Sequence, residues 1–438
     1  IFLPMYPIFC VFMNSKNYFL LSTFAFMQII VVIYYIYYSL EYGYLPSPFI
    51  NDKSNSFMDL YNTMCWSSRG EYYSIWSSVY PPINFLLLQM LQGVFSLDVC
   101  SGSAEVYRAD YIWLMSMYFL MVFLLPFFII RASGNYNISP DKYTIQKILL
   151  YVIIILSPSV LFTLERGNLI FLSVLVLVYL LSVKSEKHKV LLIALLIILK
   201  PYFLLLSIYY LARRDFKNFF RVVTFSGLIF IVTGALLEEN YWLFFYNIIG
   251  FSGHESLFSN REVLSFPSSV SSFSYVLSSQ DSFLTFLNIS SDFVSIIIDL
   301  TKYTLLIIAV IIYLKNGKFL NVQEGFFYLI IIITNLGISV GGYSLLLYLP
   351  FLPYIFILRK DLPTYNIVLV LFMVFLNSSM LDLVNLYSQN IGAQFSFLAN
   401  RMVEVDWSIT LGSALRPVLN MLLFIFVIYR VNKNKNIL

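Results

Sequence analysis

Glu165 and Arg166 place opposite charges side by side between two long apolar stretches. Each charge costs about 2.5–3.5 kcal/mol at the centre of a bilayer. Gly167 permits a tight turn, and Asn168 suits a helix start, so a helix–turn–helix at a membrane surface explains this pair. It explains the adjacent opposite charges poorly, because neighbours on a helix point in different directions. Those charges are also candidates for a binding site.

Lys200 lies near the middle of a second apolar stretch, residues 190–212, and Pro201 follows it. Proline removes a backbone donor and breaks or kinks a helix. A lysine beside a helix break inside a membrane indicates a functional site, for which an anion such as phosphate is the natural ligand. Two structural explanations stay open. Lys200 pairs with Glu165, or it reaches the membrane surface from a short helix.

Two aspartates, Asp52 and Asp59, lie in the polar connection 41–79. The sequence "YPP" follows at the start of the next apolar run, where the first helical turn tolerates proline. An acidic, aromatic loop against a membrane suits a carboxylate acting as a general base beside a sugar. Alternatively, this is a solvated loop in which Asp59 caps a short helix.

Two further long connections carry polar residues. Residues 238–293 contain His254 and have the Trp and Tyr content of helices that lie in the membrane interface. His254 is a candidate for substrate binding, although most loop histidines are not catalysts. Residues 381–411 contain Asp382 and Arg401, which suit polar recognition without specifying a chemistry.

The composition defines the class of protein. Of 438 residues, 60% are hydrophobic and 11% are charged, and the mean hydropathy is +0.81. A soluble protein carries about 25% charged residues. The chain is therefore predicted to be a multi-pass integral membrane protein in contact with membrane lipids.

About twelve apolar runs are long enough, or nearly so, to span a bilayer. Basic segments in the second half alternate between helix ends, which places both termini in the cytoplasm and the three long connections outside. The basic segment 184–189 contradicts this count, so the orientation of the first five helices stays open. The runs fall at about 18–40, 80–97, 111–130, 147–163, 168–183, 190–212, 219–237, 294–314, 326–341, 343–358, 364–380 and 412–430.

Several functions have no support in the sequence. Three cysteines without paired spacing and two histidines indicate neither a disulfide framework nor a metal site. No phosphate-binding glycine loop, zinc-protease motif or basic–aromatic patch is present. We expect no resident cofactor and no nucleic-acid partner, without excluding a divalent metal.

The order of the motifs resembles a known family. "MDLYNTM", "YPPINFLLLQML", "ERGNLIFLSVLVLVYLL" and "ALLIILKPYFLLLSIYYLARRD" follow one another with the spacing of integral-membrane mannosyltransferases that use polyprenyl-phosphate-mannose. These enzymes belong to the GT-C superfamily. The resemblance covers mainly residues 55–217.

The resemblance implies one all-α transmembrane domain over residues 1–438, with short interfacial helices in its extracytoplasmic loops. It implies an inverting hexosyltransferase of the bacterial inner membrane that acts in polysaccharide or glycolipid synthesis. The donor would be a polyprenyl-phosphate sugar, and the acceptor a lipid or glycan. The catalytic base falls on Asp59, with Asp52 as a less well aligned substitute. Predicted substrate-binding residues are Glu165, Arg166, Asn168, Lys200, Tyr202, His254 and Tyr343.

One departure and two alternatives stay open. Many family members carry histidine where this chain reads "SVGGYSLLLYLP", with Tyr343, so we expect donor recognition or the sugar to differ from the mannose-using members. A polysaccharide polymerase would depend on Arg261 and Arg401 instead of Asp59. A flippase or transporter would show related halves with matching helix breaks, and only the Lys200–Pro201 break is evident.

Overall fold

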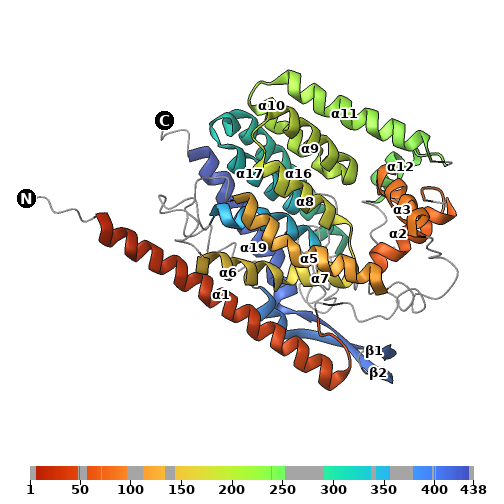
Figure 1. The fold of residues 1–438 in the computed structure, drawn as a ribbon, viewed down its shortest axis with the longest axis vertical. Helices are drawn as coiled ribbons and strands as arrows, with labels where there is room; N and C mark the ends of the chain where they lie inside the picture. Colours follow the sequence, from red (N-terminus) through yellow and green to blue (C-terminus); the bar gives the residue numbers. More distant parts are fainter. Residues whose placement is uncertain are drawn as a thin grey trace, which may run out of the picture.

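A computed structural model describes residues 6–47, 49, 57–70, 72–95, 112–133, 144–237, 239–251, 291–336, 342–355, 378–396, 399 and 401–433. The chain is mostly helical (Figure 1). Its long helices are α1 (Tyr6–Tyr42), α5 (Ile112–Ser133), α11 (Phe216–Ala235), α16 (Ser291–Asn316) and α19 (Leu411–Lys433).

Shorter helices connect and pack between the long ones. They include the bent pair α6 and α7, which meet at 44°. The short elements are α2 (Met58–Arg69), α3 (Pro82–Phe95), α6 (Thr144–Ile155), α7 (Pro158–Arg166), α8 (Ile170–Ser182), α9 (Glu186–Leu199), η3 (Pro201–Ser207), α10 (Ile208–Ala212), α12 (Leu243–Phe251), η4 (Gly317–Phe319), α17 (Val322–Leu336), η5 (Gly342–Phe351) and η7 (Ser378–Leu383).

The predicted number of membrane spans is not confirmed. In the described part of the chain, five helices are long and apolar enough to cross a membrane, or six if the bent pair α6–α7 is one span. The predicted twelve are not confirmed. Several apolar runs are interrupted, and a helix such as α8, with 13 residues, is about 20 Å long against a hydrocarbon layer of about 30 Å.

The predicted break at Lys200–Pro201 is confirmed. Helix α9 ends at Leu199, and Lys200 is extended with φ −148° and ψ 116°. The chain then continues as the 3-10 helix η3, since proline cannot supply the backbone N–H that an α-helix needs.

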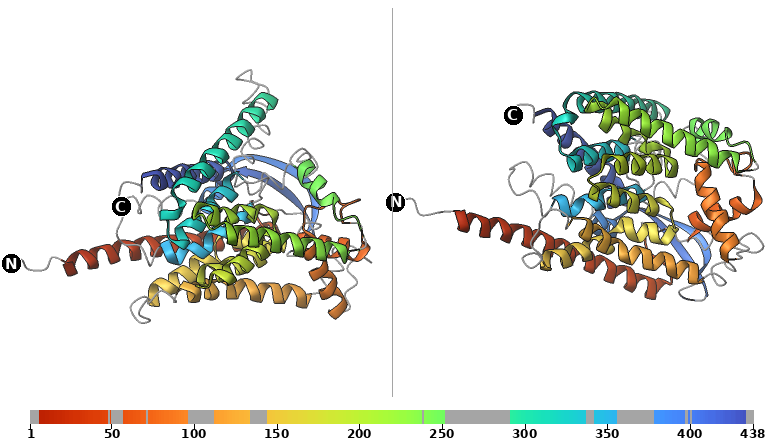
Figure 2. Two further views of the ribbon diagram at one scale, coloured as in Figure 1. Left: turned by 90° about the horizontal axis from the view of Figure 1, so that it is seen from above. Right: turned by 45° about the horizontal axis from the view of Figure 1, so that its top comes forward.

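One hydrophobic core joins the long helices, from Leu21 on α1 to Val431 on α19. The first residues of α1 and the last of α19 lie at one end of the helical array (Figure 1). Helices α2, α3 and α12 gather at the opposite end, and the two further views agree (Figure 2). Helices α2 and α12, which belong to the polar connections 41–79 and 238–293, therefore lie at the same end of the helical array.

The connection 381–411 forms a β-hairpin, which corrects the all-α prediction with interfacial helices at this place. β1 (Asn385–Ser396) pairs antiparallel with β2 (Arg401–Thr410). The cause is a two-residue alternation in "RMVEVDWSIT". Val403, Val405 and Trp407 are buried, whereas the side chains between them are exposed.

Asp382 joins this hairpin to the helical core. Its carboxylate accepts a hydrogen bond from Thr410 at 2.6 Å and forms an ion pair with Arg416 of α19, also at 2.6 Å. Both charged side chains are fully buried. Removing either partner of a buried ion pair costs about 3–5 kcal/mol, because the other charge stays behind. We therefore assign Asp382 a structural role.

Candidate active site

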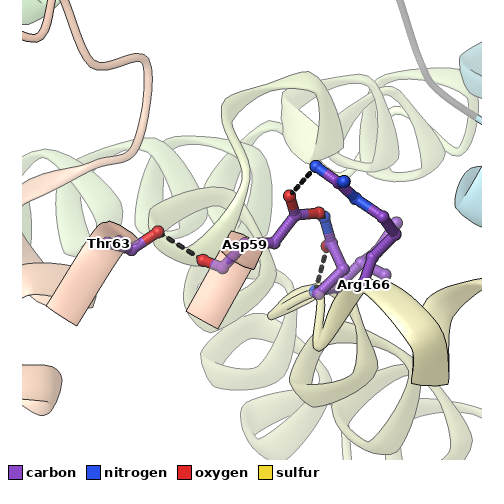
Figure 3. A network of polar contacts seen from close by, with 5 residues as sticks. Asp59, Thr63 and Arg166 are labelled. Atoms are coloured by element: carbon purple, nitrogen blue, oxygen red, sulfur yellow. Dashed lines mark hydrogen bonds and ion pairs between the residues drawn. The ribbon is translucent and has the colours of Figure 1, made fainter. Parts of the chain in front are cut away.

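Asp59 occupies the first turn of α2, where a helix favours a negative charge. Phe57, the residue before the helix, has φ +62°, and its N–H donates to the Glu165 carbonyl oxygen at 2.7 Å. The start of α2 is thus attached to the end of α7. The hydroxyl group of Thr63, one turn later, donates a hydrogen bond to the backbone carbonyl oxygen of Asp59 (Figure 3).

The Asp59 carboxylate is held on both oxygens. Arg166 at the end of α7 donates to Oδ1 at 2.8 Å, and the Asn168 side-chain amide donates to Oδ2 at 2.6 Å. Figure 3 shows Arg166 reaching toward Asp59 from the end of its helix. The Arg166 side chain is 8% exposed and the Asp59 side chain is 15% exposed. A carboxylate has about four lone-pair sites, so a fixed Asp59 can still accept a further hydrogen bond.

The turn 166–168 explains how these donors converge. Gly167 has φ +64°, and its N–H bonds back to the last turn of α7. Asn168 uses its other amide atom, Oδ1, to accept the N–H of Ile170 at 2.9 Å, as expected of a residue that starts a helix. The adjacent residues Glu165 and Arg166 make different contacts. Arg166 reaches Asp59 through its side chain, and Glu165 holds Phe57 through its backbone.

Lys200 lies at the helix break and faces an aromatic ring. Its Nζ is 4.0 Å from the centroid of the Tyr80 ring, a cation–π contact. Across the residues that the structure describes, no carboxylate lies within ion-pair distance of Lys200, so the alternative pair with Glu165 is not formed. Asp59 is nevertheless close enough to act on Lys200 electrostatically.

Asn84 is a member of this region that sequence reasoning missed. This buried amide donates to the Leu199 carbonyl oxygen at 3.2 Å, next to the break that positions Lys200. A polar residue three positions after "YP", inside an apolar run, is the signal that could have identified it.

Three tyrosines accompany the charged groups. Tyr80, Tyr202 and Tyr343 are each half-buried. Asp59, Tyr202 and Tyr343 each lie within electrostatic range of Tyr80. The ring of Phe162 on α7 stacks against Tyr343, with centroids 5.9 Å apart.

The structure brings most of the predicted site residues together. Asp59, Arg166 and Asn168 are in direct contact, and Lys200, Tyr202 and Tyr343 lie beside them. Asp52, His254 and Arg261 lie outside the described residues. Arg401 is exposed at the start of β2.

Cys65 on α2 is disulfide-bonded. The sequence indicates no disulfide framework, because its three cysteines lack paired spacing. It does not predict this bond, since pairing depends on distance in the fold and not on spacing in the sequence. In the described ranges, no group of three His, Cys, Asp or Glu residues is placed to hold a metal ion.

Comparison with known protein families finds a match to glycosyltransferase family 87 over residues 79–317, which is more than half of the chain. The chain belongs to glycosyltransferase family 87. The match includes Arg166 and Lys200, whereas Asp59 precedes its first residue. No curated protein and no solved structure gives a match.

Membership of family 87 confirms the predicted glycosyltransferase activity. Together with the apolar helices, it also supports the prediction of a membrane enzyme. It does not specify mannose, a polyprenyl-phosphate donor or inversion of configuration.

Gly167→Ala is expected to lower the thermal stability of this family 87 enzyme. A Cβ atom at Gly167 would lie 2.9 Å from the Phe57 ring, and φ +64° is unfavourable for alanine. The backbone strain alone is of the order of 1–3 kcal/mol. The measurement is the Tm of the purified protein in detergent. Gly93→Ala in α3 is the control, because nothing lies within 4 Å of its Cβ position. Equal Tm values for the two variants would contradict the role given to the turn.

Proposed function

We propose that this enzyme transfers a sugar from a polyprenyl-phosphate donor to a lipid-linked or glycan acceptor. The observation that carries the proposal is that two groups of opposite charge, Asp59 and Lys200, lie near each other without forming an ion pair. Asp59 is a carboxylate fixed by Arg166 and Asn168, and Lys200 is a nearby cation without a carboxylate partner among the described residues. An acceptor hydroxyl and a donor phosphate are the ligands that suit these two groups.

Asp59 acts on the acceptor in this proposal. Its carboxylate takes the proton of the acceptor hydroxyl while the hydroxyl oxygen attacks the anomeric carbon. The bond between that carbon and the phosphate oxygen breaks, and the lipid phosphate departs with the electron pair. Arg166 and Asn168 hold Asp59 in one orientation, so the free lone pairs point in a fixed direction. Attack from the face opposite the phosphate inverts the anomeric configuration.

Lys200 acts on the donor. Negative charge grows on the phosphate oxygen as the sugar leaves, and a preorganised ammonium stabilises that charge most strongly when water is excluded. Arg166 suits this role less well, because its guanidinium already pairs with Asp59 at 2.8 Å. Tyr80, Tyr202 and Tyr343 supply aromatic faces and hydroxyl groups for a hexose, either mannose or a related sugar.

Two observations support catalysis on the extracytoplasmic face. Disulfides persist mainly in oxidising compartments, and Cys65 lies on the same helix as Asp59. Helix α2 also lies at the end of the helical array opposite the start of α1 and the end of α19 (Figure 1). The proposal therefore keeps both termini in the cytoplasm, and it keeps the bacterial inner membrane that the family resemblance implies.

The test is a transfer assay on membranes that contain the protein. Radiolabelled polyprenyl-phosphate sugars, polyprenyl-diphosphate-linked glycans and nucleotide sugars are offered separately with extracted lipid acceptors. Membranes from cells without the protein are the control. We expect label to move to an acceptor only from a polyprenyl-monophosphate sugar. Transfer from the diphosphate-linked glycans alone would favour a polymerase, and movement of labelled lipid across the bilayer without transfer would favour a flippase.

A further inference from the structure

The loop 72–80 connects α2 with α3 and ends at Tyr80, the residue that covers Lys200. The Ser78 N–H donates to the Tyr72 carbonyl oxygen at 3.0 Å, which folds the loop back on itself. Tyr72 and Tyr73 are buried against Phe85 of α3, with ring centroids 4.4 and 5.8 Å away. The conformation of this loop therefore decides where Tyr80 lies.

Glu239, which is distant in the sequence, is hydrogen-bonded to the backbone of this loop. Its two carboxylate oxygens accept consecutive backbone N–H groups, from Tyr73 at 2.9 Å and from Ser74 at 2.7 Å. The partners are 166 and 165 residues apart in the sequence. Hydrogen bonds to a charged acceptor are about twice as strong as those between neutral groups, so this contact fixes the loop backbone.

Asn247 on α12 adds a second attachment. Its side-chain amide donates to the Tyr73 carbonyl oxygen at 3.0 Å and to the Ser78 carbonyl oxygen at 3.3 Å. The amide is buried, and the Phe244 ring packs edge-on against Tyr73 with centroids 6.2 Å apart. Helix α12 lies beside α2 and α3 at the same end of the molecule (Figure 1). Residues 239–247, at the start of the second polar connection, are thus bound to residues 73–78 of the first.

A hydrogen bond between Tyr73 and Tyr80 connects the attached part of the loop to the candidate active site. The Tyr73 hydroxyl donates to the Tyr80 carbonyl oxygen at 3.0 Å. The phenol is protonated at neutral pH and can donate, and burial together with the neighbouring Glu239 carboxylate raises the pKa of Tyr73 further. The Tyr80 ring then lies 4.0 Å from the Lys200 ammonium.

We propose that Glu239 is a positioning residue that acts on Lys200 through Tyr73 and Tyr80. By fixing the loop 72–80, it keeps the Tyr80 ring against the ammonium and so directs Lys200 at the donor phosphate. This inference rests on the proposed donor. It concerns donor binding and leaves the acceptor base, Asp59, unaffected.

The experiment compares wild type, Glu239→Gln and Tyr73→Phe as purified full-length protein in transfer assays with a polyprenyl-phosphate sugar. Glutamine keeps the size of the side chain but offers one oxygen to two N–H groups, and phenylalanine removes only the hydroxyl. We expect each variant to raise the donor KM about tenfold and to leave the acceptor KM unchanged. The double variant should match a single one, because both residues belong to one chain of contacts.

Asp215→Asn is the matched control. Asp215 also accepts a backbone N–H, from Asn218 at 3.1 Å. It caps the N-terminus of α11, whereas Glu239 follows the C-terminus of that helix, and no hydrogen bond among the described residues links Asp215 to Tyr80. Its donor KM should equal that of wild type. A general loosening of the fold would raise both KM values together, or lower only the active fraction, and would overturn the inference.

The two proposals fail differently. If wild-type protein uses no polyprenyl-phosphate sugar, the proposed function is wrong. If wild type transfers the sugar and Asp59→Asn does not, but Glu239→Gln and Tyr73→Phe keep the wild-type donor KM, only the positioning role is wrong.

Discussion

Asp59→Asn is expected to lower the rate of sugar transfer by about 10²–10⁴-fold, the usual contribution of a general base. Asparagine keeps the size of the side chain, and its carbonyl oxygen can still accept a hydrogen bond from Arg166. It cannot take a proton from the acceptor hydroxyl. The measurement is the initial rate of transfer by purified protein at saturating donor and acceptor.

The folding control for Asp59→Asn follows from the ion pair. The substitution removes the carboxylate that pairs with the buried Arg166 charge, which is costly. The double variant Asp59→Asn/Arg166→Gln removes both charges and keeps two hydrogen-bonding amides. We expect it to restore the Tm toward that of wild type without restoring transfer. Folded Asp59→Asn protein that retains the wild-type rate would exclude Asp59 as the base.

Lys200→Met should reduce transfer by about 10²–10³-fold, as expected when a group that stabilises developing charge is removed. Methionine is unbranched and of similar length, so it can still pack against the Tyr80 ring. Lys200→Arg keeps the positive charge and should recover part of the rate. The assay measures kcat and the donor KM for each variant.

Lys318→Met is the matched control for Lys200→Met. Lys318 also lies over an aromatic ring, with its Nζ 4.7 Å from the Phe319 centroid, but it is exposed and belongs to η4. We expect wild-type kinetics from this variant. If Lys200→Met transferred sugar as fast as Lys318→Met, the phosphate would have to bind elsewhere.

The local features of the site follow from the sequence. Proline after Lys200 predicts the break between α9 and η3, since the missing N–H acts on its own helix. Gly167 and Asn168 predict a turn and a helix start for equally local reasons. The order of these motifs also indicated a membrane glycosyltransferase, which membership of family 87 confirms.

The long-range contacts do not follow from the sequence. Arg166 and Asp59 are 107 residues apart, and nothing in either segment states that they meet. The sequence alone predicts Arg166 only as a substrate-binding residue, whereas the fold pairs its guanidinium with the Asp59 carboxylate. The grip of Glu239 on the loop 72–80 was not predicted for the same reason, because it depends on how two separate connections pack.

The differences between the predicted and the observed elements have a common physical cause. Hydropathy over a window of residues does not distinguish one long helix from two short ones joined at a bend, as in α6 and α7. It also overlooks a two-residue alternation within a mixed polar segment, which here forms the hairpin of β1 and β2. Both features depend on which faces are buried after the chain has packed.

The most direct test of the proposed reaction measures both products at once with purified wild-type protein. A polyprenyl-phosphate sugar labelled in the sugar and in the phosphate is mixed with the acceptor, and transferred sugar and free polyprenyl phosphate are counted over time. We expect one free lipid phosphate for each sugar transferred by wild type, and neither product above background from Asp59→Asn. Equal transfer by Asp59→Asn, or free lipid phosphate released by wild type without any glycosylated acceptor, would contradict the proposed transfer.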